Sequence, residues 1–118
     1  MKRILAALFG PLLCALLISP ASADYPDKVV RIIVPVAAGG GVDVMARLLA
    51  QRLSERLGQQ FIVENRAGAA GVIGTKSVIA ALGDGYTLLY TPSSLSLTVA
   101  VHKTAPYDVG KDLTPIIN

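Results

Sequence analysis

The segment from Val29 to Gly58 constrains the fold of this chain more than any other part. It opens with a largely apolar, β-rich run that ends at Pro35, continues through the glycine run 39–41, and enters a helix-period pattern that stops at Gly58. A strand-like run that feeds a helix through glycines predicts the first half of a βαβ unit. It also brings backbone N–H groups and a helix start to the end of a strand, where an anion can bind with little help from side chains.

Strand and helix signals alternate along the rest of the chain. We expect strands over Val29–Val34, Phe61–Val63 and Tyr86–Tyr90, and helices over about Val42–Leu57 and about Val72–Leu82. In the first helix, we expect apolar i,i+4 pairs to form the sheet-facing side: Val44/Leu48, Met45/Leu49, Leu49/Leu53 and Leu53/Leu57. Asp43 suits the positive end of this helix and can pair with Arg47, which we place on the outer face.

This order predicts an α/β fold with right-handed βαβ units and a parallel sheet of strand order 2-1-3. With the first strand in the middle, the loops after the first and third strands open at the same edge, at a topological switch point. These loops are 36–41, which offers backbone N–H groups, and 91–94, which offers three hydroxyls beside a proline. Together they predict a site for a carboxylate or a similar anion.

The first 23 residues have the pattern of a secretory signal peptide. Lys2 and Arg3 precede an apolar stretch from Ile4 to Ile18, and small residues follow at 21–23. We therefore expect cleavage after Ala23, a mature domain over 24–118, and a periplasmic location. The apolar stretch is short against the roughly 20 residues of a membrane span, so a retained N-terminal anchor is the alternative. Bulky Leu13 before Cys14 argues against lipidation.

Removal of this segment changes the charge argument. Cys14 is the only cysteine, so the mature chain can form no internal disulfide. The formal charge falls from +3 to about +1, because Lys2 and Arg3 supply two of the positive charges. The remaining basic residues are spread out and aromatic residues are few, which argues against nucleic-acid binding.

A series of short blocks follows one another through the mature part of the chain. They are Ile33-Val34-Pro35, Gly39-Gly40-Gly41-Val42-Asp43, Ala46-Arg47, Leu53-Ser54-Glu55-Arg56-Leu57-Gly58-Gln59, Val63-Glu64-Asn65-Arg66, Gly68-Ala69-Ala70-Gly71-Val72-Ile73-Gly74, Asp84-Gly85-Tyr86-Thr87-Leu88, Tyr107-Asp108 and Lys111-Asp112-Leu113-Thr114-Pro115-Ile116. In order and spacing, these blocks resemble the Bug family, the periplasmic substrate-binding receptors of tripartite tricarboxylate transporters.

The resemblance implies a two-lobed, type II periplasmic-binding-protein fold, of which residues 24–118 form the first part of the N-terminal lobe. It implies a receptor that binds a small organic acid for delivery to membrane permease subunits, without catalytic residues or a cofactor. In that family the ligand carboxylate is held largely by backbone amides and small hydroxyl residues. Carried over, the binding positions are Val36, Ala37, Ala38, Gly39 and Gly40 in the first loop and Thr91, Ser93 and Ser94 in the second.

The chain departs from the family pattern at several positions. Val42 stands where Thr or Ser is usual, Ala67 replaces Pro, Ala70 replaces Gly, and Val72 replaces Asn. The chain is also short and stops at Asn118, inside what we expect to be the next strand. We therefore expect a truncated product without the second lobe, with exposed apolar surface that favours self-association.

Enzymatic alternatives find little support in the motifs. The glycine run is not followed by Gly-Lys-Ser/Thr, and the third glycine of a dinucleotide fingerprint falls on Val44. His102 is the only histidine and has no metal-ligand or triad partner nearby, while Ser93 and Ser94 lack a G-x-S-x-G setting. Three hypotheses follow: a carboxylate receptor, a nucleotide-binding Rossmann-like enzyme domain, and a fragment without binding activity.

Overall fold

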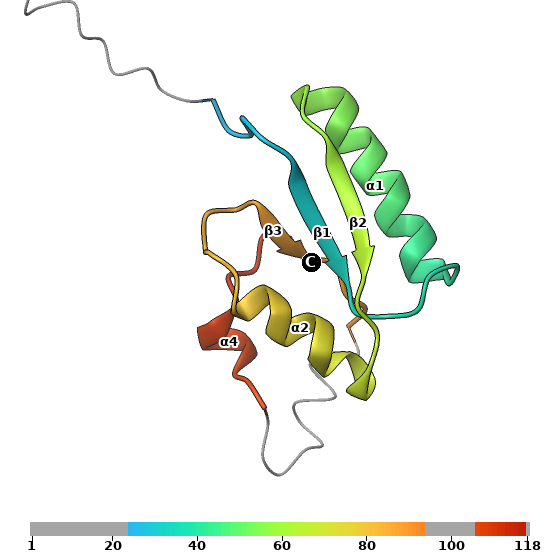
Figure 1. Cartoon of the computed structure of the whole chain (residues 1–118), viewed down its shortest axis with the longest axis vertical. Helices are drawn as coiled ribbons and strands as arrows, with labels where there is room; N and C mark the ends of the chain where they lie inside the picture. Colours follow the sequence, from blue (N-terminus) through green and yellow to red (C-terminus); the bar gives the residue numbers. More distant parts are fainter. Residues whose placement is uncertain (1–23, 94–105, 118) are drawn as a thin grey trace, which may run out of the picture.

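The structure, a computed structural model, describes residues 24–93 and 106–117 (Figure 1). The predicted signal peptide over 1–23, Ser94 and His102 lie outside these residues. The elements in chain order are β1 (Val30–Val34), α1 (Gly41–Leu57), β2 (Phe61–Asn65), the 3-10 helix η2 (Ala69–Gly71), α2 (Val72–Ile79), β3 (Thr87–Leu89) and α4 (Val109–Asp112).

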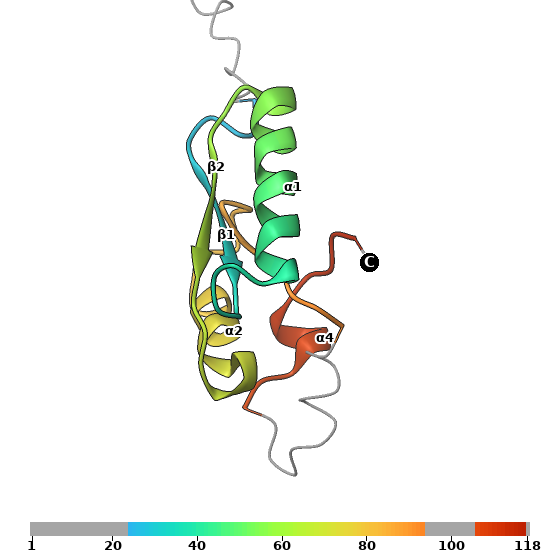
Figure 2. The same cartoon turned by 90° about the vertical axis from the view of Figure 1, so that its right-hand side faces the viewer.

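The three strands form one parallel sheet of order β2-β1-β3, which confirms the predicted topology. Val30 pairs with Phe61 on one side of β1, and Arg31 pairs with Thr87 on the other. Each predicted strand is present, but β2 continues two residues beyond the prediction, to Asn65, and β3 is one residue shorter at each end. Figure 2 shows the sheet nearly edge-on, with α1 along one side of it.

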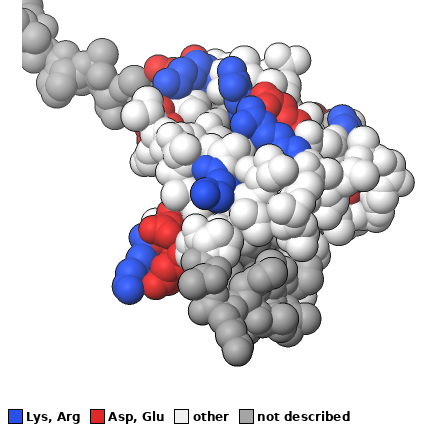
Figure 3. Space-filling model, turned by 60° about the horizontal axis from the view of Figure 1, so that its bottom comes forward, with Lys and Arg blue, Asp and Glu red and all other residues white. Residues whose placement is uncertain are grey.

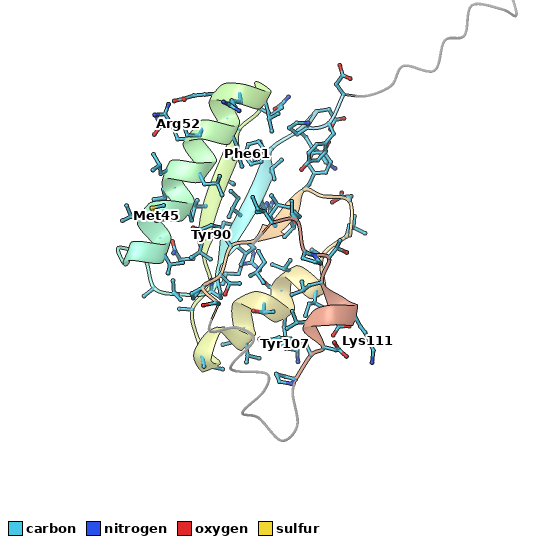
Figure 4. All side chains as sticks on the ribbon, turned by 180° about the vertical axis from the view of Figure 1, so that it is seen from behind. Met45, Arg52, Phe61, Tyr90, Tyr107 and Lys111 are labelled. Atoms are coloured by element: carbon cyan, nitrogen blue, oxygen red, sulfur yellow. The ribbon has the colours of Figure 1, made fainter. Side chains whose placement is uncertain are left out.

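Strand β1 lies at the centre of the hydrophobic core. It is buried on both faces, as expected for the central strand of a parallel sheet. Val30, Ile32 and Val34 belong to a cluster that also contains Ala46 and Ala50 of α1 and Phe61 of β2, labelled in Figure 4. Ile33 points to the other face and is equally buried. Residues packed against the cluster include Tyr86, Leu88 and Tyr90, which alternate along one strand and its ends.

Helix α1 has the predicted extent, but the predicted buried side is wrong. Its buried residues are Asp43, Ala46 and Ala50. Leu53 of the predicted pairs packs against the cluster, whereas the other members are exposed: Val44, Met45, Leu48, Leu49 and Leu57. Figure 4 shows Met45 on the side of α1 away from the sheet. Apolar residues surround most of this helix, so spacing alone could not select the side, and the small alanines allow the closest approach to the strands.

The loop before α2 has an unusual backbone. Gly68, Ala69, Ala70 and Gly71 all have positive φ, with values of 47° at Ala69 and 53° at Ala70. Ala70 occupies the left-handed region, in which glycine is the usual residue. A left-handed backbone at position 70 agrees with the glycine that the family resemblance implies there.

Helix α2 ends earlier than predicted, at Ile79 instead of Leu82. The N–H of Ala81 donates to the carbonyl of Val78 at 3.0 Å, which tightens the last turn. Leu82 is 79% exposed, so no burial would stabilise a longer helix.

The C-terminal described segment is not a strand, in contrast to our expectation for Ile116. It contains the short helix α4, whose start is capped by Asp108, and then irregular chain in which Ile116 and Ile117 are exposed. Tyr107, labelled in Figure 4, is buried just before α4. Among residues 24–93 and 106–117, no helix has the length and apolar character required to cross a bilayer.

Candidate functional site

The two loops predicted to form a site leave the sheet at the same edge. Strands β1 and β3 are parallel neighbours, and the Tyr90 N–H donates to the carbonyl of Ile33 at 3.0 Å. The chain therefore leaves β1 at Pro35 and β3 at Thr91 side by side, at the carboxyl ends of the strands. This is the edge at which open α/β sheets bind ligands.

The glycine loop presents exposed backbone at this edge. Ala37, Ala38, Gly39 and Gly40 are all exposed, and Val36 is half-buried. Gly39 has a φ of +89°, which favours glycine, but Gly40 and Gly41 have ordinary φ values. A Cβ at Gly40 would meet only the carbonyl oxygen of Ala37, at 3.9 Å, and a Cβ at Gly41 would meet no described atom within 4 Å.

Helix α1 begins at this loop without a side-chain cap from the described residues. Its N-cap is Gly40, which has no side chain to bond to the amides of the first turn. These amides are the positive end of a helix of 17 residues. The local sequence thus leaves backbone N–H groups for an external acceptor.

Asp43, in the first turn of α1, is buried next to the glycine loop. Its side chain is 4% exposed, and its Oδ2 accepts hydrogen bonds from the Gly39 N–H at 2.9 Å and from Arg47 Nε at 3.1 Å. Its Oδ1 accepts from Asn65 Nδ2 at 2.9 Å. The Gly39 amide, followed by Arg47 and Asn65, lowers the pKa of Asp43 from 3.8 to about 2.

These contacts confirm the predicted pair of Asp43 with Arg47 and add two contacts that were not expected. The Gly39 N–H, which we expected to face the ligand, already donates to Asp43. Arg47 is exposed, as expected for the outer face, and its Nη2 also donates to Asn65 Oδ1 at 3.0 Å. Within the described structure, the Gly39 N–H is therefore committed to Asp43.

Asn65 is the residue that sequence reasoning missed. Its neighbours Glu64 and Arg66 form an exposed ion pair at 3.0 Å. Asn65, however, ends β2 opposite Val34 and donates to the Val36 carbonyl at 3.2 Å. Its place at the carboxyl end of a strand that neighbours β1 was the available signal.

The second loop is described only in part. Thr91 is half-buried and its hydroxyl contacts the carbonyl of Pro92 at 3.4 Å, a long and weak bond. Ser93 is exposed. Thr91 and Ser93 thus lie on the chain that leaves β3 beside the glycine loop.

Electrostatics do not single out a basic pocket. Figure 3 shows Lys and Arg atoms next to Asp and Glu atoms on this side of the molecule, with broad uncharged areas between them. Several basic side chains are paired with acidic ones, including Arg31 with Glu64 at 3.6 Å and Arg52 with Glu55 at 3.0 Å. The described residues contain no group of three or more His, Cys, Asp or Glu side chains suited to a metal ion.

Comparison with protein families matches residues 45–118 to the tripartite tricarboxylate transporter family receptor. The chain belongs to this family. Protein BugT of Bordetella pertussis is 45% identical over 119 residues, which cover 98% of this chain and 36% of BugT. The chain spans about a third of the length of the curated relatives that it matches.

Solved structures of the receptor family share the fold. Rpa4515 of R. palustris, determined with adipate, has a TM-score of 0.68 and 37% identity over 74% of this chain and 29% of its own. MatC of Rhodopseudomonas palustris, determined with malate, has a TM-score of 0.67 and 33% identity over 77% of this chain and 31% of its own. The periplasmic binding protein BugD, 48% identical over 55% of this chain and 22% of its own, has a TM-score of 0.53. The α/β sheet described above is therefore part of a periplasmic-binding-protein fold.

Proposed function

We propose that this chain supplies part of the ligand site of a periplasmic solute receptor that binds a small carboxylate. The receptor would deliver this solute to the membrane permease subunits of a tripartite tricarboxylate transporter. Family membership supports the receptor role, and the titles of two similar structures name dicarboxylic ligands, adipate and malate. Binding, rather than catalysis, is the activity that this site supports.

The observation that carries the proposal is the open backbone at Gly40 and Gly41. Neither residue needs to be glycine for its φ or for space within the described structure, yet both lie at the uncapped start of α1. Absence of a side chain at these positions leaves room for an external acceptor to approach the amides. A carboxylate placed there also meets the positive end of the helix.

The proposed contact set follows the two loops. The first loop, Val36 to Gly40, would contribute backbone groups, and Thr91, Ser93 and Ser94 would contribute hydroxyl donors. Charge-assisted hydrogen bonds of this kind contribute about 1.5–3 kcal/mol each. Specificity would then come from loop geometry more than from net charge, which is small in the mature chain.

Export is a separate part of the proposal. The pattern of residues 1–23 supports cleavage after Ala23, with residues 24–118 as the first part of the N-terminal lobe. N-terminal sequencing of periplasmic protein should give Asp24 as the first residue. Recovery of protein that begins at Met1 contradicts processing at this position.

Calorimetric titration tests the ligand class. Malate and adipate should each be compared with ATP in a complete receptor that carries this sequence. We expect heat of binding with at least one of the carboxylates and none with ATP. Binding of ATP alone would favour the nucleotide-binding alternative. The 118-residue chain alone should bind weakly, because a site open to water screens the attraction between the loop and an anion.

A further inference from the structure

We propose that Asp43 and Asn65 are positioning residues that hold the glycine loop in the form that presents Gly40 and Gly41. This inference rests on the proposed function for its biological purpose, but the contacts that carry it are independent of any ligand. We call the hydrogen-bonded set of Asp43, Arg47 and Asn65 the loop clamp. Neither Asp43 nor Asn65 is proposed to touch the ligand.

The loop clamp joins three segments that are separate in the chain. The Asp43 carboxylate lies in the first turn of α1 and holds the loop through the Gly39 N–H at 2.9 Å. Asn65 at the end of β2 holds the loop through the Val36 carbonyl at 3.2 Å. The direct bond between the two side chains, 2.9 Å, closes the arrangement. The loop is therefore fixed at both ends, at Val36 and at Gly39.

The direction of each bond is set by its partners. Asn65 Nδ2 donates to two oxygens, Asp43 Oδ1 and the Val36 carbonyl, and its Oδ1 accepts from Arg47 Nη2 at 3.0 Å. A rotated amide would place its oxygen against both of these acceptors. Asp43 can only accept when ionised, and its three donors are the Gly39 N–H, Arg47 Nε and Asn65 Nδ2. A carboxylate at 43 and an amide at 65 are therefore matched to each other.

Arg47 removes an apparent conflict in this arrangement. A carboxylate close to an anion site would repel the ligand, and Asp43 lies only three positions after Gly40. The Arg47 guanidinium is 3.1 Å from Asp43 Oδ2, so the carboxylate carries its own counter-charge. The loop clamp can thus order the loop without adding an uncompensated negative charge next to the anion site.

An exchange of the two side chains tests the loop clamp directly. Asp43→Asn places an amide nitrogen against that of Asn65, and Asn65→Asp places two carboxylates together. The double variant Asp43→Asn/Asn65→Asp restores one donor and one acceptor in the opposite direction. Only the contact between residue 65 and the Val36 carbonyl remains unmatched, because a carboxylate at position 65 cannot donate to it.

Amide hydrogen exchange by NMR in the purified chain gives the readout without any ligand. Each single variant should accelerate exchange at Gly39 by about tenfold or more, because a charge-assisted bond is lost or distorted. The double variant should return this rate most of the way to wild type. Unchanged exchange at Gly39 in both single variants, or no recovery in the double variant, would overturn the loop clamp.

A matched control lies on the same helix. Glu55 also accepts from an arginine and an amide, Arg52 Nη1 and Gln51 Nε2, each at 3.0 Å, but it is exposed and remote from the loop. Glu55→Gln should leave exchange at Gly39 unchanged. Exchange at Ile32 in β1 should stay slow in every variant, which separates a loosened loop from an unfolded domain.

Titration with malate and adipate forms the second arm. In a complete receptor, the single variants should weaken whichever of these carboxylates the wild type binds, and the double variant should recover part of the loss. If wild type binds neither carboxylate, the proposed function is contradicted while the exchange rates still decide on the loop clamp. If exchange follows the prediction but affinity is equal in all variants, Asp43 and Asn65 stabilise the loop without positioning it for the ligand, and the proposal is wrong.

Discussion

Asn65 at the end of β2 donates a 2.9 Å hydrogen bond to the carboxylate of Asp43, 22 positions earlier in the chain. This bond connects the start of α1 with the edge strand of the sheet, and the same carboxylate accepts from the Gly39 N–H. The glycine loop is therefore not a free connection between β1 and α1. Its shape depends on a partly buried polar contact with a distant residue.

The lowered pKa of Asp43 predicts a pH dependence of stability. The folded-state pKa is about 2 against an ordinary value of 3.8, so the stabilisation is present above about pH 4 and is lost as the pH falls toward 2. Thermal unfolding midpoints of wild type and Asp43→Asn should therefore converge over this range. A constant difference between the two proteins from pH 5 to pH 2 would show that the ionised carboxylate does not stabilise the fold.

Gly74 should not tolerate a side chain. A Cβ at this position would lie 2.7 Å from the Arg66 carbonyl oxygen and 2.8 Å from Pro35 Cβ. Gly74→Ala should cost about 1–3 kcal/mol in the free energy of unfolding, measured with urea. Gly83→Ala is the matched control, because no described atom lies within 4 Å of its Cβ. Equal stability of the two variants would refute the close approach of α2 to Pro35.

Ala70 should be replaceable by glycine with a gain in stability. Its φ of 53° and ψ of 35° are left-handed, a conformation that costs an alanine about 1–2 kcal/mol. Part of that gain is offset by the larger backbone entropy of an unfolded glycine, about 0.5–1 kcal/mol. Ala70→Gly should raise the midpoint of thermal unfolding, whereas Ala67→Gly, in the same loop but without a positive φ, should not. A lower midpoint for Ala70→Gly would contradict the described loop.

The two sides of α1 should respond differently to substitution. Ala46 is fully buried against the sheet, so Ala46→Leu should destabilise the fold by about 1–3 kcal/mol. Leu48 is 48% exposed, so Leu48→Gln should change stability by no more than about 0.5 kcal/mol.

The exposed side of α1 also predicts self-association, because Val44, Met45, Leu48 and Leu49 form an exposed apolar surface. Sedimentation velocity should show self-association of the wild-type chain, and Leu48→Gln should reduce it. A wild-type chain that stays monomeric at high concentration would contradict self-association through this side of α1.

The sheet could be predicted from the sequence because its signals are local. Each strand is a short β-rich run, and the right-handed crossover rule limits the order once the helices between them are recognised. The fold therefore follows from the strand at Val29–Val34 and the two later β-rich runs, Phe61–Val63 and Tyr86–Tyr90. The ends of helices and strands were predicted less accurately, because β2 continues to Asn65 and α2 already ends at Ile79.

The buried side of α1 and the role of Asn65 could not be predicted in the same way. The helical spacing of apolar residues allows either Leu48 or Ala46 to face the sheet. Only the close approach of helix and sheet places the smaller alanine at the buried side. Asn65 contacts residues 22 and 29 positions away, so its role appears only after β2 has been placed beside β1. The glycine loop was recognised as a binding element, but the use of the Gly39 N–H by Asp43 was not.

Titration of a carboxylate into a complete receptor with two substitutions tests the backbone-anchored site most directly. Gly40→Val fits the described fold, since Gly40 has an ordinary φ and open space, so its effect should arise from blocked access to the amides. Arg47→Ala removes one member of the loop clamp but leaves the Gly39 and Asn65 bonds to Asp43. With malate or adipate as the titrant, we predict that Gly40→Val loses more affinity than Arg47→Ala. Abolished binding in Arg47→Ala together with unchanged binding in Gly40→Val would contradict a site built on backbone amides.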